Sequence, residues 1–96
     1  MGRTLAAAIG LASIAAATVA SAEPPAGAVS CSGCHPASTR VTSPVPRLAG
    51  RDQAAIVRAM QDFRSGQRAA TVMDRIAKGF TDEEVQAIAA WYATQK

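Results

Sequence analysis

The sequence is poor in the residue types from which most metal and nucleic-acid sites are built. Its 96 residues include two cysteines, one histidine, one tryptophan, one tyrosine and two phenylalanines. A structural zinc site needs four nitrogen, sulfur or oxygen ligands, usually supplied in two pairs, so a zinc site is disfavoured. The net charge is only +3, and basic and aromatic side chains are not interleaved. These features argue against a nucleic-acid partner.

The first 22 residues have the pattern of an export signal. Arg3 supplies a positive start, residues 5–20 are an unbroken run of small and apolar residues, and Ala20-Ser21-Ala22 fits an A-x-A cleavage site. The run is shorter than the ~20 residues that span a bilayer, so a retained anchor is the weaker alternative. We expect residues 1–22 to be a signal peptide, and residues 23–96 to form one exported domain with no membrane attachment after cleavage.

The two cysteines and the histidine fall together in one motif, Cys31-Ser32-Gly33-Cys34-His35. C-x-x-C-H is the attachment sequence for c-type haem, in which each thiol adds to one vinyl group and the histidine reaches the iron. A redox-active dithiol would require a strand–helix–strand context, which is missing here, and a plain disulfide would not need His35. The motif therefore predicts one covalently attached haem c with His35 as a metal ligand.

A six-coordinate iron needs a second ligand, and the single histidine leaves only methionine. Met1 is lost with the signal peptide, and Met60 falls on the apolar stripe of a predicted helix, where a core position is expected. Met73 lies in an irregular stretch between two predicted helices, where a loop can wrap over the haem. We therefore predict His35 and Met73 as the metal ligands. This ligand pair closes both faces of the haem to substrates and favours an electron carrier over a haem enzyme.

Hydrophobic periodicity predicts an all-α domain. We expect a short helix from about Ala26 into the haem motif, ended by Pro36, and then a loop over residues 36–50. A second helix should cover residues 52–65 and stop at Gly66, and a helical turn should cover residues 74–78. The last helix should begin after a capping box formed by Thr81 and Glu84. Its expected buried face is Val85, Ile88, Ala89 and Tyr92, with Trp91 at the edge.

These features together resemble a class I cytochrome c: a haem motif near the expected mature N-terminus, a later methionine and a C-terminal amphipathic helix. The segment Pro46-Arg47-Leu48-Ala49-Gly50 is similar to the P-x-L-A-G loop of c4-like cytochromes. The resemblance implies a small all-α class I cytochrome c domain wrapped around one covalent haem. It also implies that the Pro46 carbonyl accepts a hydrogen bond from His35 and that Leu48 packs on the haem.

Two further segments give a narrower resemblance. Residues 63–66 and 73–80 are similar to the cytochrome subunit of flavocytochrome c sulfide dehydrogenases. This implies a periplasmic, non-catalytic electron-transfer protein, with a flavoprotein that carries FAD as its donor and another redox carrier as its acceptor. Arg47, Arg75 and Lys78 would be candidates for the rim that orients the partner, or ordinary solvated charges. The alternatives are a free-standing c4/c5-like electron shuttle and, with an open iron site, a gas-binding haem protein.

Overall fold

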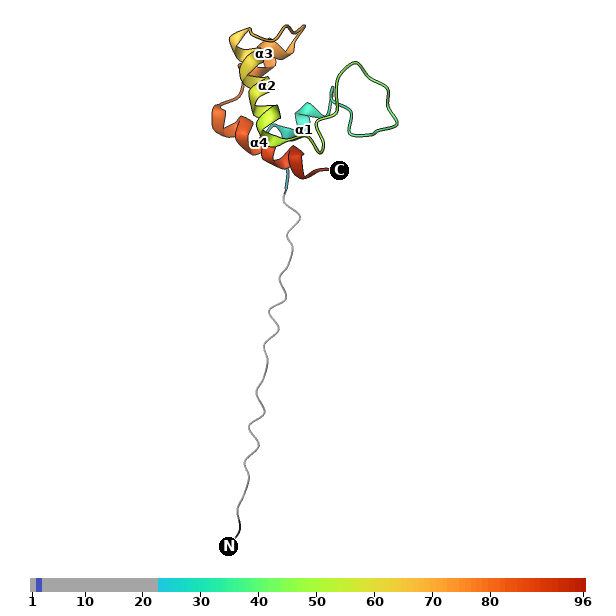
Figure 1. The fold of residues 1–96 in the computed structure, drawn as a ribbon, viewed down its shortest axis with the longest axis vertical. Helices are drawn as coiled ribbons and strands as arrows, with labels where there is room; N and C mark the ends of the chain where they lie inside the picture. Colours follow the sequence, from blue (N-terminus) through green and yellow to red (C-terminus); the bar gives the residue numbers. More distant parts are fainter. Residues whose placement is uncertain (1, 3–22) are drawn as a thin grey trace.

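The computed structural model describes Gly2 and residues 23–96, so the predicted signal peptide lies, apart from Gly2, outside the described residues. Four α-helices follow one another in the described part: α1 (Ala28–Cys31), α2 (Gln53–Ser65), α3 (Met73–Ala77) and α4 (Asp82–Thr94). No strand occurs among the described residues, which agrees with the predicted all-α class. In Figure 1, α3 lies at the far end of α2, and the loop over residues 36–50 projects to one side.

Helix α2 is bounded by a side-chain cap at one end and a glycine at the other. The Asp52 carboxylate accepts a hydrogen bond from the Ala55 N–H at 3.0 Å, so Asp52 caps the helix and the first helical residue is Gln53. At the other end Gly66 adopts φ 81°, a left-handed conformation that ends the helix. The predicted stop at Gly66 is confirmed, and the predicted start is one residue too early.

Helix α4 begins as the sequence predicts. The Thr81 hydroxyl accepts a hydrogen bond from the Glu84 N–H at 3.2 Å, and the Glu84 carboxylate accepts one from the Thr81 N–H at 2.8 Å. This reciprocal pair is the predicted capping box. Asp82, Glu83 and Glu84 also place negative charge at the positive end of the helix dipole.

Helix α1 is shorter than the sequence predicts, because the residue before it has a left-handed backbone. Gly27 has φ 87°, so the helix begins at Ala28 and not near Ala26. A Cβ atom on Gly27 would lie 2.6 Å from Cε1 of Phe80, so the Phe80 ring sits directly on this backbone. The Tyr92 hydroxyl donates a hydrogen bond of 2.6 Å to the Ala28 carbonyl, which ties α1 to α4.

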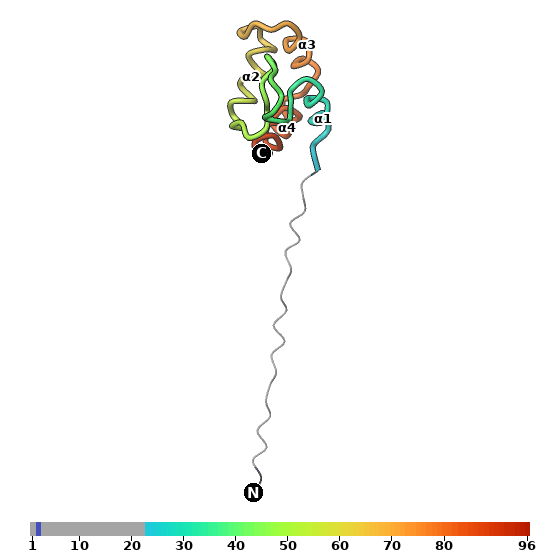
Figure 2. Tube along the Cα trace, turned by 90° about the vertical axis from the view of Figure 1, so that its right-hand side faces the viewer, coloured from blue at the N-terminus to red at the C-terminus, as the bar shows by residue number. Residues whose placement is uncertain are grey.

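The core gathers where α4 meets α1 and α2. Figure 2 shows α4 at one end of the domain beside α1, with α2 and α3 extending away from it. All four residues predicted for the buried face of α4 are buried, and Trp91 is half-buried as expected for an edge position. The main core cluster consists of Ala28, Ile56, Val57, Val85, Ile88, Ala89 and Tyr92. The core therefore holds the short helix that leads into the haem motif against α2 and α4.

Candidate functional site

The backbone stays coiled from α1 through the whole C-x-x-C-H motif. The N–H groups of Cys34 and His35 both donate to the Cys31 carbonyl, at 3.2 Å and 2.9 Å. Residues three positions apart on a helical coil are neighbours on its surface, so the coil places Cys31 and Cys34 on one face. Both thiols are free, with Cys31 half-buried and Cys34 exposed. Burial raises the pKa of the Cys31 thiol above its ordinary value of 9.0, and a backbone hydrogen bond opposes this more weakly.

The His35 ring is fixed by the loop that follows the motif. Its Nδ1 lies 2.5 Å from the Pro46 carbonyl oxygen, eleven residues along the chain. Because a carbonyl only accepts hydrogen bonds, Nδ1 must carry the proton, and Nε2 keeps the free lone pair. A neutral imidazole oriented through one nitrogen is the usual arrangement of a metal-binding histidine. The contact expected between Pro46 and His35 is therefore present.

A second contact braces the same loop. The Arg47 side chain is half-buried, and its Nε donates to the Ala37 carbonyl at 3.0 Å. This hydrogen bond lies next to the His35–Pro46 contact and joins the same two ends of the loop. Sequence reasoning considered Arg47 only as a surface charge, since a hydrogen bond to a distant backbone carbonyl leaves no pattern in the sequence.

A depression of about 250 Å³ opens beside His35. It is lined by Val29, Pro36, Leu48, Trp91 and Tyr92, among others. Leu48 also packs against the core cluster, so it connects the core with the depression that His35 lines. Tyr92 was predicted as a core residue and not as part of the site. A buried tyrosine needs a partner for its hydroxyl, but no signal in the sequence identifies the Ala28 carbonyl as that partner.

The two methionines of the described chain have different surroundings. Met60 is half-buried in α2 and packs against the core cluster, as its place on the apolar stripe predicts. Met73 is also half-buried but is not among the described residues that pack on that cluster. It is the first residue of α3, so the helical turn predicted over residues 74–78 is confirmed and lies one residue earlier than expected. A non-helical connection over residues 67–72 precedes this short helix.

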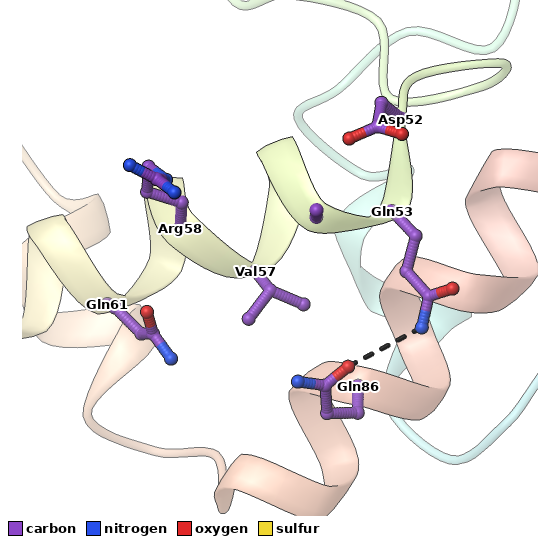
Figure 3. Close-up of a pocket in the computed structure, with 7 residues that line it drawn as sticks. Asp52, Gln53, Val57, Arg58, Gln61 and Gln86 are labelled. Carbon is purple, nitrogen blue, oxygen red and sulfur yellow. Dashed lines mark hydrogen bonds between the residues drawn. The ribbon is translucent and has the colours of Figure 1, made fainter.

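A larger depression of about 430 Å³ lies elsewhere, between α2 and α4. Figure 3 shows Gln53 and Gln86 facing each other across it, with a hydrogen bond of 3.4 Å between their amides. Val57 points from α2 toward α4, and Arg58 and Gln61 lie further along α2. None of the lining residues belongs to the haem motif or adjoins Met73 in sequence. This depression is therefore separate from the candidate site.

The donor set suits a covalently held haem. The free thiols of Cys31 and Cys34 lie on one helical stretch of backbone. The neighbouring imidazole of His35 has Nδ1 hydrogen-bonded to Pro46, which leaves Nε2 available. Cys31, Cys34 and His35 are the residues that would hold the group. When bound, haem supplies an iron that gains and loses one electron. No helix in the described part of the chain is long and apolar enough to cross a membrane.

No family model matches the chain, but comparison with individual known proteins finds cytochromes. It is 41% identical over 64 residues to the cytochrome subunit of sulfide dehydrogenase from Chlorobaculum tepidum, covering 67% of this chain and 58% of that protein. It is 32% identical over 89 residues to cytochrome c4 from Pseudomonas aeruginosa, covering 92% of this chain and 44% of that protein. The chain thus spans about half the length of these two relatives.

A third relative matches over most of its length. Cytochrome c-554(548) from Halomonas halodenitrificans is 31% identical over 70 residues, which cover 69% of this chain and 84% of that protein. These likenesses agree with the free thiols, the oriented histidine and the helical fold. The cofactor is haem c. The chain belongs to the class I c-type cytochromes.

Proposed function

We propose that this chain is the haem subunit that accepts electrons from a flavoprotein sulfide dehydrogenase. The observation that carries the proposal is the likeness to a sulfide dehydrogenase cytochrome subunit over two thirds of the chain. The flavoprotein would perform the sulfur chemistry, and this chain would take up electrons singly and pass them to another redox carrier. It would itself have no catalytic residue.

The proposed iron ligands are Nε2 of His35 and the thioether sulfur of Met73. The bond from Nδ1 to Pro46 leaves Nε2 as the only free nitrogen of the ring. Met60 packs on the core, and this leaves Met73 as the methionine available to the haem. With both axial positions held by protein side chains, small molecules have no open coordination site. The ligand pair therefore supports electron transfer over the alternative of gas binding.

Exposed basic residues on α3 and just after it would orient the partner. Arg75 and Lys78 are exposed and follow Met73 closely along the chain. Arg47 is left out of this rim, because its Nε is engaged with the Ala37 carbonyl. Replacing Arg75 and Lys78 by glutamate is expected to slow association and to weaken its salt dependence, with the haem spectrum unchanged. An association rate that does not respond to these changes would contradict the proposed rim.

The protein would work in the periplasm, after removal of residues 1–22. This rests on the A-x-A pattern at Ala20–Ala22 and on haem attachment outside the cytoplasm in families with this motif. Mass spectrometry of the exported protein is expected to find Glu23 as the first residue. A mature chain that retains residues 5–20 would point to an anchored protein.

The partner is tested by purifying the protein from its native periplasm at low salt and assaying each fraction for sulfide-dependent haem reduction. We expect the haem protein to elute with a flavoprotein and to be reduced by sulfide in the same fraction. The likeness to cytochrome c4 favours a second candidate, a free-standing electron shuttle. A haem protein that elutes alone, with no reduction by sulfide in any fraction, would support that second candidate.

A further inference from the structure

Arg64 joins the two sequence segments that resemble sulfide dehydrogenase cytochromes. Its Nη1 lies 2.6 Å from Oδ1 of Asp82, and its Nη2 donates to the Phe80 carbonyl at 2.9 Å. The Arg64 side chain is 32% exposed and that of Asp82 is 73% exposed. Of the two Arg64 contacts, the hydrogen bond to the Phe80 carbonyl is therefore the one better shielded from solvent. One guanidinium thus holds the chain on both sides of Thr81, the residue that caps α4.

The two contacts close the segment over residues 66–79 into a loop that starts and ends at the same end of α2. The start of the loop is also held, because the Arg68 N–H donates to the Asp62 carbonyl at 3.1 Å. The Arg68 guanidinium lies 5.4 Å from the centre of the Phe63 ring. Met73 and the rest of α3 lie inside this loop. The position of Met73 therefore depends on contacts made by the last two turns of α2 and the chain that follows it.

Arg64 also acts, through Phe80, on the helix that ends at Cys31. The Phe80 ring packs directly on the Gly27 backbone, where an added Cβ would meet Cε1 at 2.6 Å. Gly27 immediately precedes α1, and Cys31 is the last residue of that helix. Fixing the Phe80 carbonyl therefore keeps the loop that carries Met73 in a fixed relation to the helix that carries Cys31.

We propose that Arg64 is a positioning residue that holds the loop over residues 66–79 so that Met73 stays on the iron. The proposal rests on the proposed ligation by His35 and Met73. A ligand carried by a loop is bound only in the fraction of molecules in which the loop is closed. Loss of the two Arg64 contacts raises the population of the open loop, and an added ligand can then take the place of Met73.

The test compares four variants of the full haem-loaded protein: Arg64→Gln, Arg64→Lys, Asp82→Asn and Arg58→Gln. Arg64→Gln removes both contacts, whereas Arg64→Lys keeps the charge but cannot reproduce the planar two-pronged contact. Asp82→Asn weakens only the exposed ion pair, for which a small effect is expected. Arg58→Gln removes an exposed arginine on the same helix and serves as the control.

Two readouts are needed, namely amide hydrogen exchange over residues 67–79 and the affinity of the oxidised protein for added imidazole. We expect Arg64→Gln to speed exchange and to tighten imidazole binding, each by about tenfold, the scale of one charge-assisted hydrogen bond. Arg64→Lys should show most of this change and Asp82→Asn little of it. Arg58→Gln should match the wild type in both measurements.

The outcomes separate this proposal from the ligand assignment. Exchange that stays at the wild-type rate in both Arg64 variants would overturn the positioning role. Faster exchange without tighter imidazole binding would also overturn it, because the loop would then not govern access to the iron. A wild-type protein that lacks the near-infrared thioether–iron band would refute the ligation by Met73 itself. The role of Arg64 toward the iron would fall with that ligation.

Discussion

Replacing Tyr92 by phenylalanine removes one hydroxyl group from the contact between α1 and α4. That hydroxyl donates a hydrogen bond of 2.6 Å to the carbonyl of Ala28, a fully buried residue. Removing a donor from a buried acceptor costs about 1–3 kcal/mol. In a domain of 60–100 residues each kcal/mol lowers the melting temperature by about 4–8 °C. Tyr92→Phe is therefore expected to lower the melting temperature of the haem protein by at least about 4 °C.

The assay is thermal unfolding of the haem protein, followed by circular dichroism. Thr94→Val is the matched control, because the Thr94 hydroxyl makes a bond of similar length, 2.7 Å, to the Trp91 carbonyl at an exposed position. Its loss should change stability by no more than about 0.5 kcal/mol. Equal melting temperatures for wild type and Tyr92→Phe would refute the idea that this bond ties α1 to α4.

The same pair of proteins gives a prediction for pH. Burial raises the pKa of the Tyr92 hydroxyl above its ordinary value of 10.0, and in the haem-free chain the charge of the Cys31 thiolate adds to this effect. The unfolded chain then loses this proton at a lower pH than the folded one. The resulting stabilisation is complete below pH 10.0 and is lost as the pH rises through the folded pKa. The stability advantage of wild type over Tyr92→Phe should therefore change little below pH 10.0 and decrease above it.

Two other changes test the attachment of haem and the packing of α1. Changing Cys31 and Cys34 together to alanine should leave haem that acid–acetone removes from the chain, and a largely unfolded domain; haem that resists extraction from this variant would contradict attachment through the two thiols. Gly27→Ala should cost more stability than Gly66→Ala in denaturant unfolding. Both glycines have positive φ, for which alanine costs about 1–2 kcal/mol, but only at Gly27 does the new Cβ meet Phe80. Equal losses would mean that the Phe80 contact does not matter.

The features that could be predicted from the sequence are those encoded over a few residues. The capping box joins Thr81 to Glu84, the stop of α2 depends on Gly66 alone, and the haem motif occupies five consecutive positions. The helical period predicts a core position for Met60, and Met60 packs against the core cluster. In each case the interacting groups are close in sequence, so the pattern and the structure contain the same information.

The features that could not be predicted join residues far apart in the chain. The Tyr92–Ala28 bond spans 64 positions, and the Arg64–Asp82 ion pair spans 18. Composition and periodicity indicate that such side chains are buried or charged, but not which partner they meet. The His35–Pro46 contact was anticipated only through the resemblance to a known loop. The left-handed Gly27 escaped prediction because glycine permits that conformation without requiring it.

The central claim is that His35 and Met73 hold the iron of an electron carrier. The most direct measurement is the near-infrared spectrum of the oxidised wild type, Met73→Ala and Met60→Ala. Met73→Ala should lose the weak thioether–iron band and have a lower reduction potential. Met60→Ala should keep the band and lose about 2–5 kcal/mol of stability, as for a core methionine. A band that survives in Met73→Ala and disappears in Met60→Ala would contradict the assignment.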